Sequence, residues 1–133
     1  MLRYVFVVLL VGTAAFVANA QPSEVELENY VHAAVQKYDS GDYDKAIAML
    51  GNVVERDQAN DAAYYYLALS YVQKNEPDLA EHYLQKAVEY DPSNYWYRQR
   101  LAALYAATSR AEHAVAVYEE LLEKKKKKSE IYF

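Results

Sequence analysis

Apolar side chains between residues 27 and 123 recur three or four positions apart, which is the spacing of one face of an α-helix. Small residues such as Ala68 and Ala80 stand where two antiparallel helices have to approach closely. Larger residues such as Leu67 and Tyr71 are spaced to fill the seam between them. The pattern predicts an all-α protein built from paired helices.

The same pattern repeats every 34 residues. Residues 61–94 form the clearest copy, and residues 27–60 align with it without a gap. Helix-turn-helix units of this length stack into an array, because each unit buries its apolar face against the next. We predict three repeats, at 27–60, 61–94 and 95–123, with a short lead at 21–26 and a basic tail at 124–133.

Turn-forming residues separate the predicted helices from one another. Gly41 offers a left-handed helix end in the first copy, and Asn75 stands at the same place in the second. Pro77 suits the first turn of the following helix, and Asn94 offers a polar cap for the helix after that. Gly51 lies inside a helical run, where it costs about 1 kcal/mol relative to Ala. Its alternative role is to allow close contact between helices.

The middle copy resembles the tetratricopeptide repeat family at its signature positions. These are Tyr64, Leu67, Ala68, Tyr71, Ala80, Leu84, Ala87 and Pro92. The first copy departs from the family pattern at Ala33, Lys37 and Gln58, and the third has Arg98 in the bulky place. The resemblance implies a right-handed superhelical array of about three repeats that binds other proteins along a concave face.

By the same resemblance, the first helix of each repeat lines a concave groove. The residues expected there are Val31, Val35, Tyr38, Tyr65, Leu69, Val72, Trp96, Gln99 and Ala103, with Arg98 and Arg100 to pair with an acidic group beside them. Tyr71, Tyr83, Tyr105 and Tyr118 are expected to pack in the core instead.

Aromatic residues grouped on one surface favour binding of a peptide segment, since Tyr and Trp bury much area at little entropic cost. The resemblance therefore implies a non-catalytic adaptor. Two alternatives stay open for this face: the chain's own N-terminal segment or a second copy covers it, or its rings stack on cell-wall sugars.

Chaperone-binding members of the family hold a terminal carboxylate with Lys, Asn and Arg side chains. The corresponding residues here are Val31, Val35, Tyr66, Trp96 and Arg100, of which only Arg100 matches. We therefore expect an extended or helical partner segment with apolar anchors rather than a clamped carboxyl terminus.

The first 20 residues have the layout of a secretory signal peptide. Arg3 precedes an apolar run at 4–18, and Ala18-Asn19-Ala20 is a small-residue cleavage site. We expect export to the periplasm, the cell envelope or the medium, with Gln21 as the new first residue. The alternative is that 1–20 is retained as a membrane anchor. Because the sequence contains no cysteine, the repeats have to be stable through their helical core alone.

Charge divides the chain into an acidic body and a basic end. Residues 24–123 carry 18 acidic and 8 basic side chains, whereas 124–133 carries 5 basic and 1 acidic. An acidic body argues against nucleic acid as a partner. The run Lys124–Lys128 is either a solvated helix end or a contact with anionic lipid at a membrane surface or with an acidic partner.

A second hypothesis is a self-assembling scaffold subunit, a homo-oligomer. It rests on an apolar end face near Val115, Val117 and Leu122, with no further capping helix after it.

Catalytic and metal-binding motifs are missing from the sequence. The histidines His32, His82 and His113 fall in different repeats, and none has a second His or a Cys at metal-ligand spacing. There is no Gly-rich phosphate loop and no nucleophile elbow. The sequence predicts that the protein is not an enzyme and binds no cofactor or metal.

Overall fold

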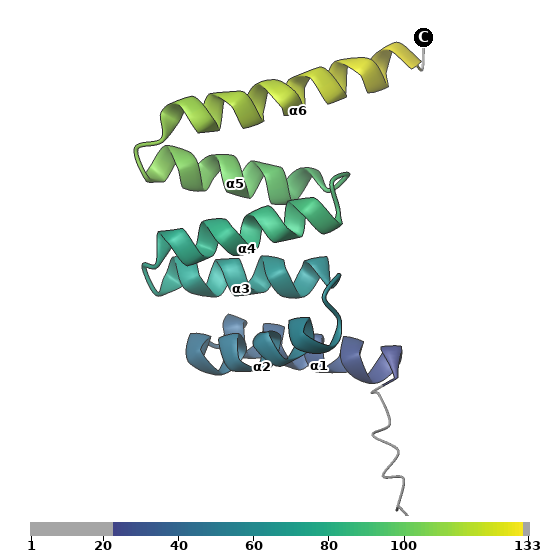
Figure 1. Cartoon of the computed structure of the whole chain (residues 1–133), viewed down its shortest axis with the longest axis vertical. Helices are drawn as coiled ribbons and strands as arrows, with labels where there is room; N and C mark the ends of the chain where they lie inside the picture. Colours follow the sequence, from purple (N-terminus) through teal and green to yellow (C-terminus); the bar gives the residue numbers. More distant parts are fainter. Residues whose placement is uncertain (1–22, 132–133) are drawn as a thin grey trace, which may run out of the picture.

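The computed structural model describes residues 23–131, and all regular structure in that range is α-helical. The helices are α1 (Glu24–Asp39), α2 (Tyr43–Arg56), α3 (Asp61–Gln73), α4 (Pro77–Tyr90), α5 (Tyr95–Ala107) and α6 (Ala111–Ile131). Figure 1 shows them stacked in chain order along the long axis of the molecule. The predicted all-α array of about three helix-turn-helix repeats is confirmed. The signal peptide expected at 1–20 lies outside the described residues.

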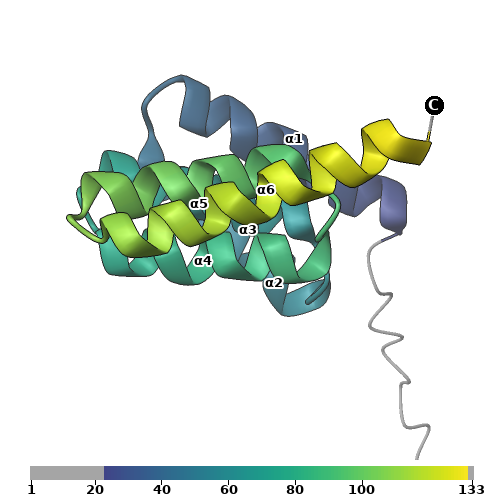
Figure 2. The ribbon, with the colours of Figure 1, turned by 90° about the horizontal axis from the view of Figure 1, so that it is seen from above.

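Each helix packs against the next one in the chain, and α1 also contacts α3. Seen from above, the pairs lie over one another as layers of a stack (Figure 2). Alanines without exposed surface stand at the helix contacts and let the backbones approach. They are Ala34, Ala46, Ala63, Ala68, Ala80, Ala87 and Ala102. Leu50, Leu67 and Leu84 fill the space between the helices and are almost fully buried.

The turn within each repeat has one residue in the left-handed region, and these residues are 34 positions apart. Gly41 has φ 82°, Asn75 has φ 57° and Ser109 has φ 60°. In each case the next residue donates its backbone N–H to the carbonyl five positions earlier, at 2.9 Å. This closes the preceding helix. The role of Gly41 and Asn75 was predicted, whereas that of Ser109 was not.

The turns between repeats are closed by asparagine caps. The Asn60 side chain accepts from the backbone N–H of Ala63 at 3.0 Å, and Asn94 accepts from that of Trp96 at 3.1 Å. Pro77 occupies the first turn of α4, as its sequence context predicts.

Three local features add detail to the expectations. First, α1 begins at Glu24, inside the lead expected at 21–26, because Ser23 and Glu26 form a reciprocal capping box. Second, α6 continues through Lys124–Lys128, so most of the expected tail is helical. Third, no neighbouring side chain or helix approaches within 4 Å of a Cβ built on Gly51. Gly51 therefore does not serve a close helix contact.

Candidate functional site

A row of tyrosine rings crosses the repeats on their first helices. Tyr38 of α1 meets Tyr66 of α3 with ring centroids 5.8 Å apart, and Tyr66 meets Tyr65 at 5.4 Å. Tyr65 in turn stacks on Tyr97 of α5 at 4.9 Å. Centroid distances of this size are those of favourable aromatic pairs. The row therefore links all three repeats through contacting aromatic side chains.

A pocket of about 290 Å³ opens at the α5 end of this row. We call it the Trp96 pocket, and its lining residues are Tyr65, Trp96, Gln99, Arg100, Ala103 and Tyr118. Trp96 is 68% exposed, although it is the largest side chain of the set. A large aromatic residue left in solvent beside a hollow is typical of a binding surface.

Five of the residues expected in or beside the groove meet in this pocket: Tyr65, Trp96, Gln99, Arg100 and Ala103. The other groove residues do not line it. Val31 and Tyr38 are half-buried and pack against the core. Leu69 is only 8% exposed, so it contributes packing rather than an accessible anchor. Val35 is half-buried and Val72 is exposed.

Tyr118 is a pocket residue that the sequence places in the core. It is 40% exposed, whereas Tyr105 is buried as expected and Tyr71 and Tyr83 are half-buried. The reason is positional: Tyr118 lies on the last repeat, where no described helix follows α6 to cover it.

This region combines tyrosine hydroxyls with one charged group, the guanidinium of Arg100. Burial raises the pKa of Tyr38 and of Tyr66, so both remain protonated hydrogen-bonding groups at neutral pH. The charge of Arg100 lies near enough to Tyr38 to oppose part of that shift. The surface thus offers aromatic area together with one guanidinium group that suits a carboxylate.

A larger cavity, of about 670 Å³, lies between the start of α5 and the second half of α6. We call it the end pocket, and it is lined by Pro92, Ser93, Tyr95, Arg98, Leu121, Lys124, Lys125 and Lys128. It shares no lining residue with the Trp96 pocket. Arg98 and the lysine run are separated in the sequence, and their meeting in one pocket was not predicted.

Within residues 23–131, no group of three or more His, Asp or Glu side chains is placed to hold a metal ion. His32, His82 and His113 are exposed, and the ring of His32 forms a hydrogen bond with Gln36. Over the same range, no helix is both long enough and apolar enough to cross a membrane.

Comparison with known proteins agrees with this architecture. The sequence pattern of the family described as tetratricopeptide repeat matches residues 37–86 and 72–132. No curated protein matches the chain.

Among solved structures, a crystal structure of MamA superposes with a TM-score of 0.73 at 24% identity, over 78% of this chain and 61% of the MamA chain. This chain thus spans about three fifths of that relative.

Two further structures contain bound peptides. SycD of Yersinia enterocolitica, in complex with a peptide of the translocator YopD, gives a TM-score of 0.68 at 20% identity, over 83% of this chain and 86% of SycD. The first tetratricopeptide domain of Spaghetti (RPAP3), bound to the HSP90 peptide SRMEEVD, gives 0.70 at 22% identity, over 78% and 82%. These likenesses show a shared fold. Because the family pattern covers well over half of the sequence, the chain belongs to the tetratricopeptide repeat family.

Proposed function

We propose that this protein is a non-catalytic adaptor that binds a peptide segment of a partner protein in the Trp96 pocket. Tetratricopeptide repeat proteins are typically binding modules without catalytic activity. The observation that carries the proposal is the exposure of Trp96 beside a pocket formed by α3, α5 and α6. Large aromatic side chains in such places supply much of the binding energy of protein interfaces.

The mechanism rests on preorganisation. Tyr65 is held between Tyr66 and Tyr97, and the Tyr97 hydroxyl is in turn bonded to Asp61. A partner segment therefore meets a surface that is already ordered, which lowers the entropic cost of binding. Apolar side chains of the segment would pack on Trp96 and Tyr65, and an acidic side chain would pair with Arg100.

The two peptide-bound relatives support this kind of function, since SycD and the RPAP3 domain hold peptides on the same fold. A clamp for a terminal carboxylate does not fit the residues of this groove. The residues at the corresponding positions include Val31 and Val35, which have no donor side chain. Recognition of apolar anchors by the Trp96 pocket fits the residues better.

The experiment that tests the proposal uses photo-crosslinking from a defined position. Ala103 is replaced by a photo-crosslinking amino acid, and the protein is irradiated in a cell-envelope extract. The matched control carries the crosslinker at Ala48, which is exposed on α2, outside the Trp96 pocket. We expect a partner that is captured from position 103, missed from position 48 and lost with Trp96→Ala. Equal capture from both positions would overturn the proposal.

Export of the protein belongs to the same proposal and rests on the sequence of residues 1–20. Intact-mass measurement of the protein from its own cells tests it. A mature chain that begins at Gln21 supports export with cleavage, and an intact N-terminus in the cytosolic fraction opposes it.

A second candidate function is self-assembly through the outer face of α6. Val115 is 54% exposed and Leu122 is 66% exposed on this last described helix. Exposed apolar side chains on a terminal repeat favour stacking of another copy. Light scattering over a range of concentrations tests this idea. A rise in mass that Leu122→Glu abolishes would support the scaffold, and a constant monomer mass would exclude it.

A further inference from the structure

The end pocket concentrates positive charge around an apolar floor. Among the described residues that line it, Arg98, Lys124, Lys125 and Lys128 are cationic and none is acidic. Leu121 is buried and forms part of the floor. In Figure 1 the C-terminal end of α6 reaches past the ends of α4 and α5, and no described helix follows α6 in the stack.

Arg98 is the unusual member of this set, because it is charged and only 7% exposed. Its Nη1 donates to the Glu120 carboxylate at 2.7 Å, while its buried Nε has no hydrogen-bond partner. Glu120 also accepts from Lys124 at 3.2 Å, so one carboxylate is shared by two cations. The guanidinium has five donor hydrogens, and its bonding capacity is therefore not exhausted.

The preceding repeat shows which side chains occupy the equivalent position. A shift of 34 residues relates Arg98, Leu121 and Lys124 to Tyr64, Ala87 and Tyr90. In that earlier repeat the rings of Tyr64 and Tyr90 stack 5.5 Å apart. The following helix, α5, supplies Tyr97 to the same cluster.

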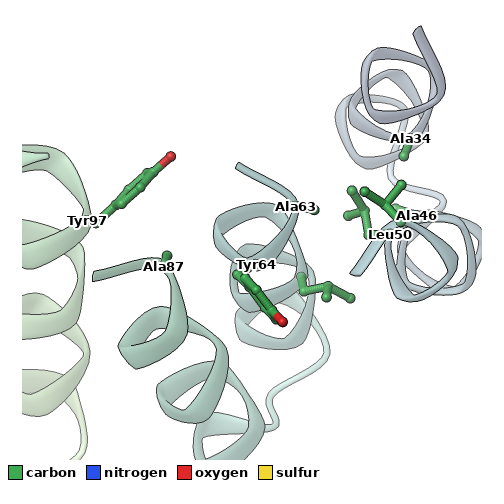
Figure 3. Close-up of a cluster of buried hydrophobic side chains, with 9 residues drawn as sticks. Ala34, Ala46, Leu50, Ala63, Tyr64, Ala87 and Tyr97 are labelled. Carbon is green, nitrogen blue, oxygen red and sulfur yellow. The ribbon is translucent and has the colours of Figure 1, made fainter. Parts of the chain in front are cut away.

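Figure 3 shows Tyr97 beside Ala87, and both belong to one buried cluster with Tyr64. The Tyr97 hydroxyl donates to Asp61 at 2.7 Å. The end pocket is thus the position where the next helix of the stack would insert a side chain. In the last repeat, the neutral stacked pair is replaced by two cations, Arg98 and Lys124.

From this correspondence we infer that the end pocket binds an acidic amphipathic helix of a partner protein. The helix places one aromatic or bulky apolar side chain beside Leu121, as Tyr97 lies beside Ala87. Its carboxylates face Arg98, Lys124 and Lys128. The site is separate from the Trp96 pocket and gives the adaptor a second contact, at the end of the stack.

The pocket favours this ligand over a membrane surface. A bilayer would attract the whole lysine run, including Lys126 and Lys127, which do not line the pocket. A helix seated in the cavity depends on Lys124 and Lys128 instead. Charge reversal of either lysine pair changes the net charge equally, so the two pairs form a matched comparison.

The probes are three fluorescein-labelled peptides with the sequence of residues 94–107, which form the helix that fills the equivalent position one repeat earlier. The first carries Arg98→Glu and Arg100→Glu, the second keeps both arginines, and the third adds Tyr97→Ser to the first. Fluorescence anisotropy measures their binding to the full chain. We expect the acidic peptide to bind at least about tenfold more tightly than either of the others.

The protein variants then locate the site. Lys124→Glu/Lys128→Glu should weaken binding of the acidic peptide by about tenfold or more, and Lys126→Glu/Lys127→Glu by less than about threefold. Circular dichroism checks that both variants keep their helix content. Equal weakening by the two variants, or no binding of the acidic peptide, would overturn the inference.

Two other occupants are distinguished in the same experiment. Binding to phosphatidylglycerol vesicles that both lysine variants weaken equally, without peptide binding, would assign the run to a membrane instead. Self-association in sedimentation that only Lys124→Glu/Lys128→Glu removes would identify a second copy as the occupant. Either result would overturn the inference that a partner helix occupies the end pocket.

Discussion

The hydroxyl of Tyr97 donates a hydrogen bond to the carboxylate of Asp61 at 2.7 Å and so joins the first helices of two successive repeats. Tyr97 is 7% exposed, and its ring also stacks on Tyr65. This contact fixes α5 against α3. It thereby helps to set the spacing of Tyr65 and Trp96, two of the three aromatic residues that line the Trp96 pocket.

Removal of that hydroxyl should loosen the junction. Tyr97→Phe is expected to lower the free energy of unfolding by about 1–2 kcal/mol, because the hydrogen bond is lost and the Asp61 carboxylate loses its donor. Urea unfolding followed by circular dichroism measures the change. Tyr95→Phe is the control, since Tyr95 is half exposed. An equal loss in both variants would show that the hydrogen bond contributes no stability.

Alkaline pH should destabilise the fold. Burial, reinforced by the hydrogen bond to Asp61, raises the pKa of Tyr97 far above its ordinary value. Burial also raises the pKa of Tyr38, Tyr64, Tyr66 and Tyr71. The unfolded chain loses these protons near pH 10, while the folded chain keeps them.

The contribution of these tyrosines to the free energy of unfolding is therefore fully present below about pH 10. It is lost progressively as the pH rises further. Urea titrations between roughly pH 8 and 11 test this, and Tyr97→Phe should show a shallower fall. A stability that stays level up to pH 11 would contradict the assignment.

Two glycine substitutions should have opposite signs. Gly51→Ala is expected to raise the free energy of unfolding by about 0.5–1 kcal/mol, because the added Cβ meets open space and alanine favours the helix. Gly41→Ala should lower it by about 1 kcal/mol, because φ is 82° there. Thermal and urea unfolding of both variants check the signs. A stability loss in Gly51→Ala would indicate a helix contact that the structure lacks.

Ser109 offers a third test of the same turn. Ser109 has the same left-handed backbone conformation as Gly41 and Asn75. Serine tolerates this conformation less well than glycine or asparagine. Ser109→Gly is expected to raise the free energy of unfolding by up to about 1 kcal/mol. Asn75→Gly is the comparison and should change it less, since Asn already accepts this conformation. An equal gain in stability at both positions would show that serine fits this turn as well as asparagine does.

Trp96 and Tyr65, which both line the Trp96 pocket, should differ in their effect on the stability of the fold. Trp96→Ala is expected to change the free energy of unfolding by less than about 0.5 kcal/mol, because Trp96 is mostly exposed. Tyr65→Ala should cost about 2 kcal/mol, since Tyr65 is half-buried and packs against buried core residues. Denaturant midpoints check this. A large loss in Trp96→Ala would place Trp96 in the core and weaken the proposed function.

Local chemistry made much of the fold predictable. The recurrence of alanine and leucine at fixed spacing identifies the helix pairs, because helical packing requires small and large residues at set intervals. Gly41, Asn75 and Pro77 mark turns for reasons that concern their own backbone. Ser109 escaped prediction, since serine has no preference for the left-handed region and takes it only because the repeated turn imposes it.

The 34-residue period alone is enough to predict the repeats and the helices that carry the expected groove. Tertiary structure decided which side chains remain accessible: Leu69 is buried, Tyr118 is exposed, and Arg98 meets Lys124 from a position 26 residues away in the chain. Periodicity assigns a residue to a face of its own helix. Burial depends on whether another helix covers that face: α5 covers one face of α6, and no described helix follows α6 to cover the other.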